Sequence, residues 1–125
     1  MSRSRRSRLA ALAVASALVL PGCGGDAKPV RAGEGRLGVA LDDFLVRPQA
    51  VRTAPGRIEL EVSNRGRIGH NLHVRDGARD VLEVATLLPG ERASVAGRLE
   101  RGEYTLLCTV GNHRVLGMYG TLTVR

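Results

Sequence analysis

Hydrophobic and polar residues alternate along most of the chain after residue 36, which is the period of β-strands with one buried face. In the segment 57–63, Ile58, Leu60 and Val62 share one parity, while polar residues take the other. This pattern predicts a half-buried strand. The same alternation, with apolar residues on one parity, recurs in four further segments: 37–41, 92–99, 104–108 and 118–124.

Turn sequences that contain glycine separate these segments at intervals of roughly ten residues, the spacing typical of an all-β sandwich. No segment predicts a long helix, and 80–88 is the one stretch where a helical turn competes with a strand. We expect Phe44 and Val46 to continue the core beyond a bulge near Asp42 and Asp43. The turn sequences are Pro55-Gly56, Asn64-Arg65-Gly66, Asp76-Gly77, Pro89-Gly90 and Arg101-Gly102.

The first 22 residues carry the pattern of a bacterial export signal. Four arginines precede an apolar run at 9–20, which is too short to cross a bilayer as a stable anchor. The sequence Leu20-Pro21-Gly22-Cys23 follows and resembles a lipobox, which makes Cys23 the lipidated residue. We therefore predict an exported lipoprotein, anchored through Cys23 at the outer face of the cytoplasmic membrane or in the periplasm. The pattern leaves Sec and twin-arginine export open.

The chain is predicted to have three parts: a signal peptide at 1–22, a flexible tether at 23–35 and one domain at 36–125. Removal of the signal lowers the formal net charge from +7 to +3, because it takes away four arginines and no acidic residue. The chain has one Phe, two Tyr and no Trp, and no basic cluster is interleaved with them. Nucleic-acid binding is therefore not supported. We also expect the protein to be a monomer.

A set of soft-metal ligands lies near the carboxyl end. Cys108, His113 and Met118 are spaced as Cys-x4-His-x4-Met, between two predicted strands. With a second histidine, this set suits copper in an electron-transfer role, because thiolate and thioether prefer Cu(I) and imidazole tolerates both oxidation states. If Cys23 carries lipid, Cys108 is a lone thiol in an oxidising compartment, which a metal would explain. A disulfide between Cys23 and Cys108 is the alternative.

The second histidine is either His70 or His73, which lie three apart and so face opposite sides of a strand. His70 shares the apolar parity of Leu72 and Val74, and we therefore choose His70 as the ligand. His73 falls on the polar parity with Asn71 and is predicted to face solvent.

These motifs together resemble the cupredoxins, the type 1 or blue copper proteins. The resemblance rests on Asn64-Arg65-Gly66 followed by His70-Asn71, and on the segment 104–118 with Gly117 before the methionine and Gly120 after it. The loop spacing is similar to the rusticyanin, sulfocyanin and plantacyanin branches. The resemblance implies a Greek-key β-sandwich of seven to eight strands. It also implies one type 1 copper ion held by four ligands: His70, Cys108, His113 and, as a long axial ligand, Met118.

The resemblance also implies supporting roles. Asn71 would hydrogen-bond across to the Cys108 loop and stiffen it, and the carbonyl of Gly69 would lie near the metal. His113, with Val115 and Leu116 beside it, would form the surface through which the electron leaves, suited to weak transient docking of redox partners. Many relatives carry Pro-Gly before the loop histidine, where this chain has Gly111-Asn112.

Three other functions stay open from the sequence. The first is a copper carrier or buffer that uses the same ligands without electron transfer. The second is a zinc or metal-free interaction module, although Met is a poor zinc ligand. An enzyme is disfavoured, because copper oxidases and nitrite reductases need further His-rich copper sites and His73 is the one histidine left over. A nucleophilic Cys108/His113 pair is disfavoured as well, because the thiol points inward.

Overall fold

The structure is a computed structural model that describes residues 28–125. Within these residues the chain forms ten β-strands and no helix. None of the described segments is a helix that could cross a membrane. The strands are β1 (Val30–Arg31), β2 (Arg36–Asp42), β3 (Leu45–Arg47), β4 (Ala50–Thr53), β5 (Gly56–Asn64), β6 (His70–Asp76), β7 (Arg79–Leu87), β8 (Arg92–Leu99), β9 (Gly102–Leu107) and β10 (Tyr119–Val124).

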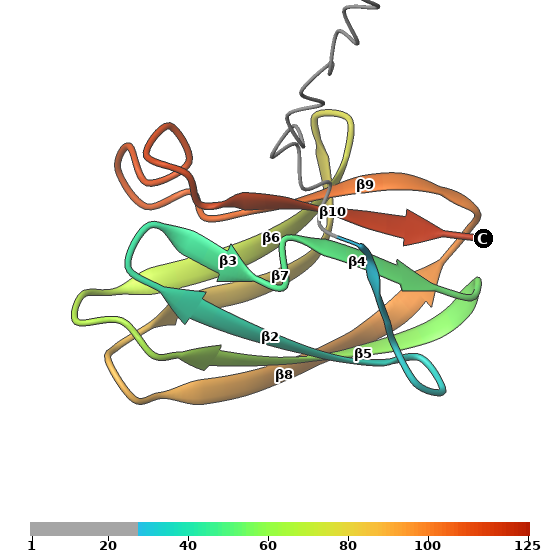
Figure 1. Ribbon diagram of the computed structural model, residues 1–125, viewed down its shortest axis with the longest axis horizontal. Helices are drawn as coiled ribbons and strands as arrows, with labels where there is room; N and C mark the ends of the chain where they lie inside the picture. The colour runs from blue at the N-terminus through green and yellow to red at the C-terminus, as the bar shows by residue number, and fades with distance from the viewer. Residues whose placement is uncertain (1–27) are drawn as a thin grey trace, which may run out of the picture.

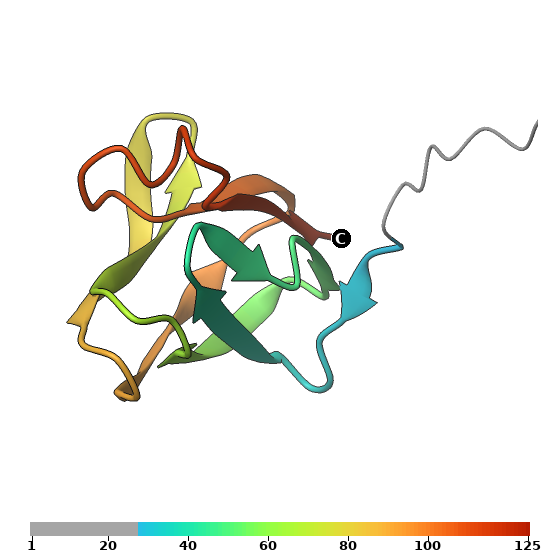
Figure 2. The same cartoon turned by 60° about the vertical axis from the view of Figure 1, so that its left-hand side comes forward.

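The strands form two sheets that face each other (Figure 1). One sheet has the order β1-β4-β10-β9-β6-β7 and the other β3-β2-β5-β8, so the chain crosses repeatedly between the layers. Strands β4 and β10 pair in parallel, as do β2 and β5, while β9 pairs antiparallel with both β10 and β6. Figure 2 shows how the twisted layers wrap around a common interior. The predicted all-β sandwich is confirmed.

The core consists of the residues at alternate strand positions that the sequence predicted to be apolar and buried. In β10 and the residue before it, Met118, Leu122 and Val124 are buried, while Tyr119 and Thr121 are exposed. Strand β5 likewise buries its apolar residues and leaves its glutamates more exposed. Burial of such aliphatic side chains contributes roughly 1.5–3 kcal/mol each, which is what holds the layers together. The fully buried aliphatic side chains include Leu41, Ile58, Leu60, Leu72, Leu106 and Leu122.

The strand count and the tether differ from the prediction. Residues 28–125 form ten strands instead of seven to eight, partly because the short strands β1 and β3 carry too few residues to show a period. Strand β1 pairs in parallel with β4, and the N–H of Ala32 donates to the carbonyl of Arg52 at 2.9 Å. The predicted tether at 23–35 is therefore wrong for residues 30–32, which belong to the sandwich. The predicted signal peptide at 1–22, the lipidated Cys23 and residues 24–27 lie outside the described residues.

The β2–β3 connection is a tight turn, where the sequence predicted a bulge in one continuous strand. Phe44 lies in this turn with a φ of 63° and is 38% exposed, so the prediction that it joins the core is wrong. Val46 is buried as predicted. Strand β7 shows that residues 80–87 are extended, which settles the competition between helix and strand in favour of the strand.

Four connections meet at one end of the sandwich, at the left of Figure 1: β2–β3, β5–β6, β7–β8 and β9–β10. Asn64, the buried last residue of β5, joins two of them. Its Nδ2 donates to the carbonyls of Ile68 and Leu87, each at 2.8 Å, and its Oδ1 accepts the N–H of Gly66 at 2.9 Å. The β5–β6 loop, which leads into His70, is thereby tied to the end of β7.

Candidate metal centre

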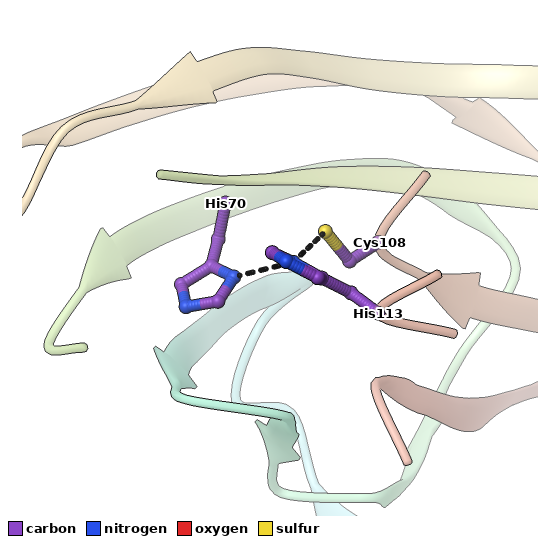
Figure 3. Close-up of side chains that lie close together, drawn as sticks. All are labelled: His70, Cys108 and His113. Carbon is purple, nitrogen blue, oxygen red and sulfur yellow. Dashed lines mark hydrogen bonds between the residues drawn. The ribbon is translucent and has the colours of Figure 1, made fainter. Parts of the chain in front are cut away.

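Three side chains of metal-ligand type converge at this end of the sandwich (Figure 3). Nδ1 of His70 lies 3.2 Å from Nδ1 of His113, and that atom lies 3.6 Å from Sγ of Cys108. One ligand atom from each residue lies within 4.8 Å of the other two, and all three residues are buried. The structure thus brings together the three predicted residues from positions far apart in the chain.

The strands and the β9–β10 loop fix these positions. His70 is the first residue of β6, and Cys108 directly follows β9. The loop folds back on itself around His113, whose N–H donates to the carbonyl of Val110 at 3.0 Å. The carbonyl of His113 accepts the N–H of Met118 at 3.0 Å, and the N–H of Cys108 donates to the carbonyl of Met118 at 3.1 Å. These bonds hold the three loop residues against one another.

Met118 is fully buried in the same core cluster as Cys108, so its side chain points inward as predicted. Its backbone is bonded to both Cys108 and His113. A thiol, two imidazoles that turn Nδ1 to one space, and a thioether nearby make a donor set that fits copper. Among residues 28–125, the group found at this place is His70, Cys108 and His113, which lacks the oxygen ligands that Mg²⁺ and Ca²⁺ prefer.

Asp43 contacts the outer nitrogen of His70, which the sequence did not predict. Oδ1 of Asp43 lies 3.0 Å from Nε2 of His70 and accepts the N–H of Arg67 at 2.9 Å. The hydrogen bond with His70, followed by that from the Arg67 backbone, lowers the pKa of Asp43 from 3.8 to about 2. No local pattern signals this contact, because it joins the β2–β3 turn to a strand 27 positions later.

Asn71 makes the hydrogen bonds to the Cys108 loop that were predicted for it. Its Nδ2 donates to Oγ1 of Thr109 at 2.7 Å, and its Oδ1 accepts the N–H of Thr109 at 2.7 Å. Thr109 directly follows Cys108, so this pair of bonds ties the start of the β9–β10 loop to β6. Two such bonds orient the residue next to the thiol.

Replacing Asn71 with alanine is expected to loosen the start of this loop. Both bonds to Thr109 are lost, which costs about 1–2 kcal/mol of unfolding free energy. Amide hydrogen exchange at Thr109 should become faster, and a denaturant titration should show the loss of stability. Asn112→Ala is the matched control, because Asn112 lies exposed in the same loop. Unchanged exchange at Thr109 in the Asn71 variant would contradict a bracing role.

His73 does not face solvent, so this prediction is wrong. Its side chain is 11% exposed, with Nδ1 at 3.2 Å from Oδ1 of Asp80 and Nε2 at 3.3 Å from Oγ1 of Thr109. The parity put His73 on the outer face of its sheet correctly, but Asp80 of β7 and Thr109 of the β9–β10 loop enclose it there. His73, Asp80 and Glu83 form a second group of ligand type. The Asp80 carboxylate is already bound by Nε of Arg75 at 2.6 Å, which lowers the pKa of Asp80.

The surface predicted for electron transfer lies beside His113. Val115 is 86% exposed, and Leu116 is exposed as well. The ring of Phe44 meets the ring of His113 edge-on, with centroids 5.3 Å apart.

Gly69 directly precedes β6, where a Cβ would lie 3.1 Å from Cγ2 of Thr86. The predicted contact between the Gly69 carbonyl and a metal stays a prediction.

No protein-family profile matches the chain, and no curated protein matches it in sequence. Solved structures do match its fold. The dithionite-reduced auracyanin of the photosynthetic bacterium Roseiflexus castenholzii matches with a TM-score of 0.68 at 18% identity, over 75% of this chain and 99% of that one. Auracyanin A of Chloroflexus aurantiacus, described as a "blue" copper protein, matches with a TM-score of 0.64 at 15% identity, over 77% and 100%.

A copper-containing nitrite reductase from Thermus scotoductus also matches, with a TM-score of 0.55 at 20% identity over 72% of this chain but 22% of the enzyme chain. At such identities the comparisons show the fold alone. The predicted fold is thus confirmed: the sandwich is cupredoxin-like.

Proposed function

We propose that this protein is a mononuclear type 1 copper protein of the cupredoxin family that carries single electrons between redox partners. His70, Cys108, His113 and Met118 would hold the ion. The observation that carries the proposal is the buried convergence of the Cys108 sulfur and one ring nitrogen of each imidazole within 4.8 Å, with Nδ1 of His113 3.2 Å from Nδ1 of His70 and 3.6 Å from Sγ of Cys108. The match in fold over the full length of the auracyanin A chain, a "blue" copper protein, supports it.

Copper bound at such a site would supply a one-electron couple. The surrounding chain would keep the positions of the ligand residues nearly constant. His70 is held by β6, while Cys108 and His113 are held by backbone bonds within the β9–β10 loop. Their burial excludes water from the ligand atoms. Because hydrogen bonds within the strands and the loop already hold these residues, little movement of the ligand side chains is needed when the charge of the site changes.

His113 is the least buried of the three converging side chains, at 9% exposed against 0% for His70 and Cys108. The exposed residues Val115 and Leu116 follow it in the loop, its carbonyl accepts the N–H of Leu116 at 3.1 Å, and its ring meets that of Phe44. A small apolar surface suits weak, short-lived docking of a redox partner. Arg114, the exposed residue directly after His113, favours acidic partners.

The place of action we favour is outside the cytoplasmic membrane, with a lipid anchor on Cys23. This rests on the leader sequence alone, which lies outside the described residues. A labelled lipid precursor supplied to cells should label the parent protein and not the Cys23→Ala variant. Equal labelling of the two proteins would contradict a lipid anchor on Cys23.

A copper carrier or buffer without electron transfer would use the same ligands. An enzyme of the nitrite reductase type is disfavoured, since two of the three histidines lie in the candidate site and the third is enclosed by Asp80 and Thr109. A reversible one-electron wave in voltammetry and rapid electron self-exchange would favour the electron carrier over the buffer.

Adding Cu(II) to the purified protein is expected to produce intense visible absorption that saturates at one equivalent. The thiolate of Cys108 would give this absorption by charge transfer to Cu(II), and electron paramagnetic resonance should show the narrow copper hyperfine splitting of a type 1 site. Zn(II) added in the same way is the control, because it gives no visible colour. A pale protein with the broad splitting of an ordinary Cu(II) site would contradict the proposal.

A further inference from the structure

The imidazole of His70 has a contact on each of its two ring nitrogens, one facing the candidate metal site and one facing away from it. His70 is buried, and its Nδ1 is turned to Cys108 and His113. Its Nε2 lies 3.0 Å from Oδ1 of Asp43. Nδ1 of His70 therefore faces the candidate metal site, and Nε2 contacts a carboxylate.

Asp43 is itself held in place. The N–H of Arg67 donates to its Oδ1 at 2.9 Å, and the guanidinium of Arg67 lies 3.5 Å from its Oδ2. The loop that contains Arg67 is fixed in turn by the side chain of Asn64. The carboxylate is thus aimed at His70 by bonds from a neighbouring loop.

A glycine packs directly over the contact between Asp43 and His70. A Cβ at Gly66 would lie 2.2 Å from Oδ1 of Asp43 and 2.9 Å from Nε2 of His70, closer than atoms can approach. The backbone at this point therefore shields the contact. The Gly66 N–H lies 3.1 Å from the carbonyl of Leu41, which keeps the backbone there.

From this geometry we infer that Asp43 is a positioning residue of the copper site: it keeps the proton of His70 on Nε2 and shifts the balance between Cu(II) and Cu(I) toward Cu(II). This inference rests on the proposed function. A carboxylate that accepts Nε2–H leaves the lone pair of Nδ1 free for a metal and fixes the ring. Its negative charge favours the more highly charged ion.

Asp42 provides a matched control one residue away. Its carboxylate is bound by Nε of Arg47 at 2.6 Å and lies 3.2 Å from Nε of Arg65. It carries the same charge at the end of β2, directly before the turn, but it is engaged with arginines and not with His70. A difference between variants at the two positions therefore reports the contact with His70 and not the surface charge.

The first experiment needs no metal. Nitrogen-15 NMR of the metal-free protein at neutral pH should show His70 as the tautomer protonated on Nε2, and Asp43→Ala should give a mixture of tautomers. Asp42→Ala should leave the tautomer unchanged. A His70 proton on Nδ1 in the parent, or an Asp43→Ala spectrum identical to the parent, would overturn the inference.

The second experiment measures the reduction potential of the copper-loaded protein by voltammetry. Asp43→Asn keeps a neutral hydrogen-bond acceptor and removes the charge, so it is useful even if the alanine variant does not fold. We expect the preference for Cu(II) over Cu(I) to fall about tenfold, which raises the potential by about 59 mV for one electron. Asp42→Asn should shift it far less, and equal shifts in the two variants would overturn the inference.

Failure of this inference and failure of the proposed function can be told apart. If the parent protein does not form a type 1 site with Cu(II), the proposed function fails, while the tautomer of His70 in the metal-free protein still decides whether Asp43 positions the ring. If the parent forms the site but the Asp43 variants match their Asp42 controls, the function stands and the role of Asp43 is rejected.

Discussion

Replacing Cys108 with serine is expected to abolish the intense visible absorption of the Cu(II) form while the sandwich stays folded. The absorption needs a thiolate bound to copper, and a serine hydroxyl does not supply one. The residue is fully buried, and its sulfur lies 3.6 Å from Nδ1 of His113. A hydroxyl at that place can still bond to the imidazole, so we expect a loss of about 1 kcal/mol in unfolding free energy.

Absorption spectra and thermal unfolding of the parent and the variant, at equal copper, check this prediction. His73→Gln is the control for the histidines, since His73 lies with Asp80 and Thr109 and away from the ligand group of His70. The control should keep the colour. An unchanged spectrum in Cys108→Ser would exclude the thiolate as the ligand, and loss of colour in His73→Gln would mean that the wrong histidine was assigned.

The parity of the strands made the centre of the site predictable from the sequence. Cys108 and Met118 continue the buried faces of β9 and β10, and His70 shares the buried face of β6. Side-chain direction in a strand follows from a period of two residues, which is a local property. Once three ligand types lie on buried faces at the ends of neighbouring strands, their convergence follows from strand pairing.

The contacts around the centre could not be predicted in this way, because they depend on loops that meet only in the folded chain. Asp43 reaches His70 from a turn in which Phe44 adopts a φ of 63°. His73 was placed on the correct face, but its enclosure by Asp80 and Thr109 depends on the register of two neighbouring strands. The pairing of β1 with β4 involves two residues on each side, too few to show a period.

Asn64 holds together the loops on which the site depends. Its buried side chain donates to the carbonyls of Ile68 and Leu87, each at 2.8 Å, and accepts the N–H of Gly66. Its backbone also bonds to the β7–β8 loop, through the N–H of Gly90 and the carbonyl of Glu91. An amide suits this position because it offers two donors and one acceptor at once.

Replacing Asn64 with aspartate is therefore expected to destabilise the fold by about 2–4 kcal/mol at neutral pH, since a buried carboxylate would face two carbonyl oxygens and both donors would be lost. The unfolding midpoint should fall by about 10 °C or more. Burial beside carbonyls raises the pKa of a carboxyl, so the variant should lose stability relative to the parent as pH rises through that pKa and regain part of it as pH falls.

Thermal unfolding of metal-free parent and variant at a series of pH values between 5 and 8 measures both effects, and copper loading then shows whether the His70 loop still presents its ligand. Asn112→Asp is the matched control, because it makes the same chemical change at an exposed position of the β9–β10 loop. The control should stay within about 0.5 kcal/mol of the parent. A variant at Asn64 that is as stable as this control at every pH would show that the three bonds do not hold the loops, and that the site is positioned by the strands alone.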